Sequence, residues 1–205
     1  MTHEELNQKL MQGIKFTKDD LSFNKQGMLT PSQIQTLKDS DTFNGSKMSK
    51  LVIGIAIGGF LLGIGREGAH VFSLNFILPF LGMFAIMYFG LSLYNKNNLK
   101  KLMEGKLLVE KIHGKINPSH DEKIANASSM GQYSGVIKTA TNFAGINYAD
   151  YAYVLEIGGK KLYVNKAIHD AFERQHEYVI YFVRTSKREY QNMLHGAVIV
   201  SAEAL

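Results

Sequence analysis

The chain has 205 residues, a formal net charge of +5 and no cysteine. A chain of this length holds one or two small domains. The lack of cysteine excludes disulfides, thiol catalysis and cysteine metal sites, and it fits a reducing compartment. The mean hydropathy is near zero, but this average conceals two windows without any charged side chain, Leu51–Gly65 and Val71–Tyr94.

Residues 1–46 predict three short amphipathic helices. In the first, apolar side chains recur every three or four residues, at Leu6, Leu10 and Ile14. The second is expected to break at Gly27, and the third to begin at Thr30-Pro31, where a hydroxyl caps the helix and proline takes its first position. None is long enough to be stable alone. We therefore expect these helices to lie on the bilayer, on the C-terminal part of the chain or on a partner.

The two uncharged windows predict a two-helix transmembrane hairpin over residues 47–94. Val71–Tyr94 is long enough alone, because about 20 residues cross a hydrocarbon core of about 30 Å. Leu51–Gly65 reaches that length only if its flanks join the helix and Lys50 and Arg66 extend to opposite interfaces. Two alternatives are a buried core hairpin of a soluble protein and a first segment that is re-entrant.

Glycines in the first window form two pairs with the small-xxx-small spacing of packed membrane helices, Gly54 with Gly58 and Gly59 with Gly63. One interpretation is self-association of the chain through this face. The interpretation that we favour is packing on the second helix of the same chain. Pro79 in the second window predicts a kink.

Lysines are densest directly after the second window, and those expected to lie at the membrane surface are Lys96, Lys100, Lys101 and Lys106. Such a cluster attracts anionic lipid headgroups, so the positive charge requires no nucleic-acid partner. Lysines also precede the first window, whereas the connection between the windows offers only Arg66 beside Glu67. The positive-inside rule then places both termini in the cytoplasm.

Residues 95–205 predict a basic helical continuation and then a strand-rich cytoplasmic domain. Alternating segments are LLVEKIHGKI, SGVIKTATNF and YAYVLEIGGKKLYVN, followed by YVIYFV and AVIVSA. Gly158-Gly159 suits a tight hairpin turn, and Asn165 can cap a short helix over Lys166–Arg174. Six short strands and one helix predict a small antiparallel β barrel, SH3-like or OB-like. The expected fold is an α+β membrane protein.

Few residues suggest chemistry. His169, Glu173 and His176 follow the i, i+4, i+7 spacing that gathers ligands on one helical face. A zinc site usually adds a fourth ligand and a second shell, and Lys166 and Arg174 lie close by, so we interpret this as a solvated helix face. Phosphate-binding glycine loops are missing. We expect no enzyme activity, no metal and no cofactor.

The segments DLSFNKQGMLTPSQ, YVLEIGGKKLYVNKAIHDAF and IVSAEAL together resemble parts of small uncharacterised bacterial membrane proteins with two transmembrane helices and a C-terminal β domain. The resemblance covers about half of the chain. It implies the same layout here and an inner or plasma membrane location. It brings no established activity, so no functional residue is carried over.

The expected function is that of a non-enzymatic membrane protein whose β domain mediates interaction or assembly. Its expected partners are the lipid bilayer, further copies of the chain and an unidentified protein. One alternative is a subunit of an oligomeric pore or transport complex, for which Ser73, Asn75 and Ser92 would have to supply a polar face. The other is a membrane-anchored sensor or hydrolase.

Overall fold

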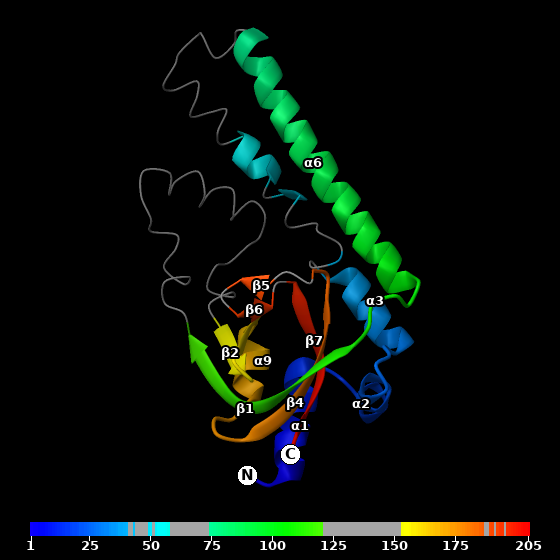
Figure 1. Cartoon of the computed structure of the whole chain (residues 1–205), viewed down its shortest axis with the longest axis vertical. Coiled ribbons are helices and arrows are strands. Elements are labelled where there is room, and N and C mark those ends of the chain that lie inside the picture. The colour runs from blue at the N-terminus through cyan, green and yellow to red at the C-terminus, as the bar shows by residue number, and fades with distance from the viewer. Residues whose placement is uncertain are drawn as a thin grey trace.

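A computed structural model of the chain describes residues 1–40, 43, 49–50, 52–57, 74–120, 153–186, 189–190, 192–194 and 196–205. The architecture is α+β. Short N-terminal helices and a curled sheet form a globular part, from which the long apolar helix α6, Leu74–Met103, projects (Figure 1). The two termini lie near each other at the end of the globular part that is remote from α6.

The three predicted N-terminal helices are present as α1, His3–Ile14, α2, Lys18–Lys25, and α3, Pro31–Asp39. Each begins with a reciprocal capping box, in which a threonine caps the helix and a side chain three residues later bonds back to it. Pro31 takes the first turn of α3 as predicted. Gly27, with a φ of 81°, separates α2 from α3, which confirms the predicted break.

The predicted β-hairpin with its turn at Gly158-Gly159 is confirmed. Strands β2, Tyr153–Ile157, and β3, Lys160–Val164, pair antiparallel with Ile157 opposite Lys160. The turn residues Gly158 and Gly159 have φ values of 55° and 72°, which glycine adopts without steric cost. The next helix, α9, spans Lys166–Ala171 and is capped by Asn165, whose Oδ1 accepts from the backbone N–H of Ile168 at 2.9 Å. It ends three residues earlier than predicted.

Strand β1, Glu110–His120, curls the sheet by changing partners. Residues 110–115 pair with β4, Glu177–Arg184, and residues 116–120 pair with β2. Gly114 lies next to the point of change, and a Cβ there would lie 3.2 Å from the backbone nitrogen of Gly158. Glycine therefore permits the close approach of β1 to the β2–β3 hairpin.

The remaining strands are β5, Glu189–Tyr190, β6, Met193–Leu194, and β7, Ala197–Ala204. The strand order is β5-β6-β3-β2-β1-β4-β7, and β6 runs parallel to β3. The described sheet is thus a mixed, curled half-barrel, where the sequence predicted an antiparallel barrel. The parallel pair arises because β5 and β6 follow β4 in the chain but lie beside β3 at the other end of the strand order. The predicted strand at 134–143 lies outside the described residues.

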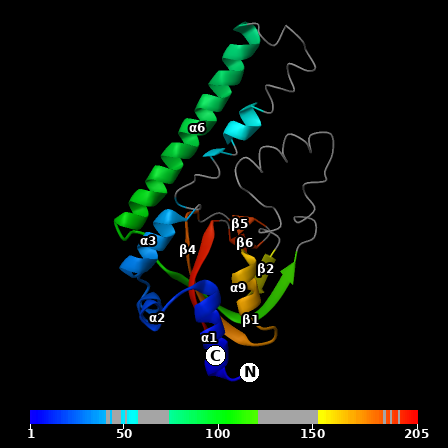
Figure 2. The same cartoon turned by 180° about the vertical axis from the view of Figure 1, so that it is seen from behind.

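Strand β4 is buried on both faces, which explains its continuous apolar run. Its residues Ile180 and Phe182 face a first core that also contains Leu10 and Phe16 from the N-terminal segment. Alternate residues face a second core, formed by Leu37, Phe43, Leu102, Tyr181, Val183 and Val200. From the sequence, the N-terminal helices were expected on the bilayer, on the C-terminal part of the chain or on a partner. In the structure they pack on the C-terminal sheet. Figure 2 shows α1 beside α9.

A buried polar network ties α2 and α3 to β7. The Gln33 side-chain amide donates to Asn24 Oδ1 and to the Val200 carbonyl, both at 3.0 Å. Asn24 Nδ2 donates to Gln33 Oε1 at 2.8 Å, and Ser201 Oγ donates to Asn24 Oδ1 at 2.6 Å. Asp20 completes the network by accepting from Thr30 Oγ. These hydrogen bonds fix the N-terminal helices in register on the sheet.

Gln33→Ala should lower the free energy of unfolding by about 1–3 kcal/mol, because it leaves buried donors and acceptors without partners. Gln35→Ala removes the same side chain from the exposed face of the same helix and should cost about 0.5 kcal/mol or less. Urea unfolding of the two variants, followed by circular dichroism, measures the difference. Equal losses would show that the network does not hold the helices.

The stability should also fall in acid through Asp20. Burial raises the pKa of its carboxyl, but hydrogen bonds from Thr30, Thr17 and Ser32 outweigh this, and the pKa lies below its ordinary value of 3.8. The stabilisation is therefore complete above pH 3.8 and is lost as the pH falls through the folded-state pKa. Asp20→Asn should flatten the acid limb of a plot of unfolding free energy against pH. Asp19→Asn, at the exposed neighbouring position, should leave that limb unchanged.

Candidate membrane interface

Helix α6 is long and apolar enough to cross a membrane. It has 30 residues, or about 45 Å of length at 1.5 Å per residue, and Ile77–Met103 is the one candidate span among the described residues. Large apolar side chains are exposed along it, at Leu78, Leu81, Met83, Ile86, Met87, Phe89 and Leu93. Apolar surface exposed over such a length is typical of a segment that lies in lipid or against a partner.

The structure describes only some of the residues that were predicted to lie in the membrane. Pro79 lies inside α6, near its start. Residues 52–57 of the first uncharged window are helical and include Gly54. Gly58, Gly59 and Gly63 lie outside the described residues, as does the rest of that window after residue 57. The predicted packing of these glycines, and the domain boundaries at residues 46 and 94, stay predictions.

The four lysines Lys96, Lys100, Lys101 and Lys106 are here called the basic collar. The first three lie near the C-terminal end of α6, and Lys106 follows it. This end of α6 joins the globular part (Figure 1). All four are exposed. Glu104 pairs with two of them, at 3.8 Å from Lys100 and 2.6 Å from Lys106, so one carboxylate offsets part of the charge. The last turn of a helix favours cations, because the backbone dipole is negative there.

The end of α6 is attached to the globular part. Leu102 is buried in the second core, and Leu99 packs against that core. About two turns before Leu102, the Tyr94 hydroxyl donates to the Thr185 carbonyl at 3.5 Å. Asn98 is 2% exposed, and its Nδ2 has no hydrogen-bond partner among the described residues. These contacts set the direction in which α6 leaves the sheet.

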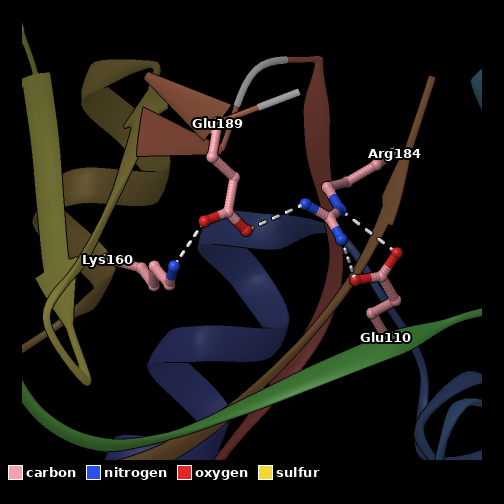
Figure 3. A network of polar contacts seen from close by, with 4 residues as sticks. All are labelled: Glu110, Lys160, Arg184 and Glu189. Carbon is pink, nitrogen blue, oxygen red and sulfur yellow. Dashed lines mark hydrogen bonds and ion pairs between the residues drawn. The ribbon is translucent and has the colours of Figure 1, made fainter. Parts of the chain in front are cut away.

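A chain of alternating charges crosses the mouth of the half-barrel beside this attachment (Figure 3). Arg184 at the end of β4 donates to Glu110 through Nε at 3.1 Å and through Nη2 at 2.6 Å. Its Nη1 donates to Glu189 at 3.3 Å, and Lys160 also donates to Glu189. The four residues come from β1, β3, β4 and β5, so the network connects the two sides of the curl.

The charges in this network stabilise one another. The hydrogen bonds to Glu110 raise the pKa of Arg184 despite its partial burial. The hydrogen bond from Lys160 and the neighbouring charges lower the pKa of Glu189. Because every charge has an opposite partner, the arrangement can hold β5 and β6 in place, and no charged group in it is left over to bind a ligand.

The histidines noted in the sequence do not form one cluster. Since α9 ends at Ala171, His176 is not on its face. The His169 ring contacts that of Tyr153 in a tilted arrangement, with centroids 5.1 Å apart, and Nδ1 contacts Asp170 at 2.9 Å. Glu173 instead pairs with Lys9 of α1. Among the described residues, no group of three or more histidine and carboxylate side chains could hold a metal ion.

Sequence reasoning missed the charged network because its members are distant in the chain and belong to no motif. The buried polar network left one signal, the capping-box spacing of Thr17 with Asp20 and of Thr30 with Gln33. That spacing predicts helix starts, but it does not show that the same side chains reach β7.

Comparison with protein families, with curated proteins and with solved structures finds no match for this chain. The resemblance to small bacterial membrane proteins therefore stays a prediction.

Arg184→Gln should destabilise the globular part by about 1–2 kcal/mol, because it leaves Glu110 and Glu189 without their shared partner. Lys160→Gln removes only the outer end of the network and should cost less. Thermal unfolding at low and at high salt measures the stability of both variants. Salt should reduce the difference in stability between wild type and Arg184→Gln. A larger loss for Lys160→Gln would contradict the central role given to Arg184.

Proposed function

We propose that this chain is an integral protein of a bacterial inner or plasma membrane, anchored by a two-helix hairpin over residues 47–94. Its globular part lies in the cytoplasm and serves interaction or assembly without catalysis. The observation that carries this proposal is the first core, in which Leu10 and Phe16 from before the hairpin pack with Ile180 and Phe182 from after it.

The shared core requires an even number of membrane crossings between its N-terminal and C-terminal residues. Residues that pack in one core must lie on the same side of the membrane. If α6 crosses once, the chain must cross a second time between α3 and α6, and the uncharged window Leu51–Gly65 is the apolar sequence there. The shared core thus supports the transmembrane hairpin, even though the first window alone is marginal in length for a span.

The basic collar supports the cytoplasmic orientation. Its lysines lie in the C-terminal part of α6 and just after it, where the globular part is attached, and positive flanks face the cytoplasm. There they would contact anionic headgroups. Since Leu99, Leu102 and Tyr94 attach α6 to the sheet, the globular part would be held in a set orientation below the bilayer, which suits the presentation of a binding surface.

Two finer parts of the proposal concern the closure of the sheet into a barrel and the association of copies of the chain. We include an SH3-like or OB-like barrel as the complete form of the half-barrel. We also include association of copies through Gly54, Gly58, Gly59 and Gly63, with packing inside the hairpin as the alternative for these glycines.

The chain lacks cysteine, so single introduced cysteines report topology without background. Gln12→Cys and Lys161→Cys place the probe on exposed positions of α1 and β3, and Gly68→Cys places it between the uncharged windows. In intact cells, a membrane-impermeant maleimide should label Gly68→Cys alone. After permeabilisation it should label all three. Labelling of Gln12→Cys and Lys161→Cys from opposite sides would overturn the proposal.

A further inference from the structure

Four large apolar side chains are exposed on α2, at the end of α6 and on the loops that follow these two helices. They are Phe23, Met28, Met103 and Leu108, here called the apolar corner, and they are 42%, 47%, 58% and 73% exposed. Outside the two uncharged windows, the only other large apolar side chains exposed among the described residues are the terminal Met1 and Leu205.

Backbone hydrogen bonds bring Phe23, Met28 and Leu108 into one region, and Met103 precedes Leu108 by five residues. The Val109 N–H donates to the Gly27 carbonyl at 3.2 Å, and the Met28 N–H donates to the Phe23 carbonyl at 3.1 Å. Met28 and Leu108 therefore flank a single hydrogen bond. Their neighbours Leu29, Leu107 and Val109 pack against the second core, so the exposed side chains of Met28 and Leu108 face away from it.

In the proposed hairpin the second helix leaves the hydrocarbon at Tyr94, so Met103 of the apolar corner lies too far from the hydrocarbon to serve as a lipid anchor. Met103 follows Tyr94, the end of the apolar window, by nine residues, which corresponds to about 13 Å of helix. The headgroup layer adds only about 5–8 Å on each side of the hydrocarbon core. An average helix tilt of about 20° shortens the distance by less than about 1 Å. The corner would therefore face water unless a protein covers it.

The charge around the corner favours an acidic partner. Residues 96–111 contain five lysines against two glutamates. Of those glutamates, Glu110 is held by Arg184 and Glu104 is shared by Lys100 and Lys106. A second copy of the chain would bring the same excess of lysine to the contact and would be repelled.

We infer that the apolar corner and the lysines beside it bind an acidic amphipathic helix of a partner protein. Methionine side chains adapt to varied apolar surfaces, and an amphipathic helix lays its apolar face on such a region while its polar flanks meet the charges around it. This inference rests on the proposed function and names the surface through which the globular part would act.

The first experiment uses a photo-crosslinking amino acid at Leu108 in the full chain, in membranes of cells that naturally contain the protein. Mass spectrometry should map the crosslink to a helical segment rich in Asp and Glu on another protein. The same amino acid at Gln12, exposed on α1, should not give that product. A crosslink to a second copy or to lipid, or the same product from both positions, would overturn the inference.

The second experiment uses the purified full chain in nanodiscs of neutral lipid and a synthetic helical peptide with a leucine face and glutamate flanks. Met28→Glu with Leu108→Glu should weaken binding about tenfold or more, whereas Gln12→Glu adds a charge elsewhere and should not. Replacing the peptide glutamates by lysine should weaken binding similarly. Unchanged affinity in either comparison would contradict the inference, even if the maleimide experiment supports the membrane topology.

Discussion

Packing of the N-terminal helices on the C-terminal sheet brings the two ends of the chain into one hydrophobic core. Leu10 and Phe16 lie in the same core as Ile180 and Phe182, although the apolar windows separate them in the sequence. None of the three N-terminal helices, at 12, 8 and 9 residues, is stable alone in water, so each depends on the sheet. The globular part is therefore complete only when both ends of the chain meet, and in the proposed topology both then lie on one side of the membrane.

The same contacts protect the open edge of the sheet. An unpaired edge strand is a template for aggregation, and β7 lies at one end of the strand order. Side chains of the N-terminal helices take the place of a further strand there. Asn7 accepts from the Ala204 N–H at 2.9 Å, and Gln33 donates to the Val200 carbonyl at 3.0 Å. At the mouth of the curl, the Arg184 network holds β5 and β6 in place. One half-barrel is thus stabilised at both ends by contacts between segments that are distant in the chain.

Local signals in the sequence predicted local structure well. The Thr30-Pro31 start, the Gly158-Gly159 turn and the Asn165 cap were confirmed because each depends on a few neighbouring residues. The parallel β3–β6 pair and the change of partners along β1 were not predicted, because alternation of apolar residues identifies strands without giving their neighbours. At the membrane interface, the lysines and the apolar length could be read directly from the sequence. The exposure of Met28 and Leu108 could not be read from the sequence, since it depends on which side of a tertiary hydrogen bond they occupy.

Zero-length crosslinking can show whether residues before and after the apolar windows touch in the membrane-embedded protein that we propose. Lys9 of α1 forms an ion pair with Glu173, which follows α9, and a carbodiimide joins an amine to a carboxylate only when the two are in contact. We expect an intramolecular Lys9–Glu173 crosslink in native membranes, lost in Lys9→Gln. If the Lys160–Glu189 pair, which lies within the C-terminal sheet, crosslinks under the same conditions while Lys9 and Glu173 do not, the shared core and the even number of crossings are contradicted.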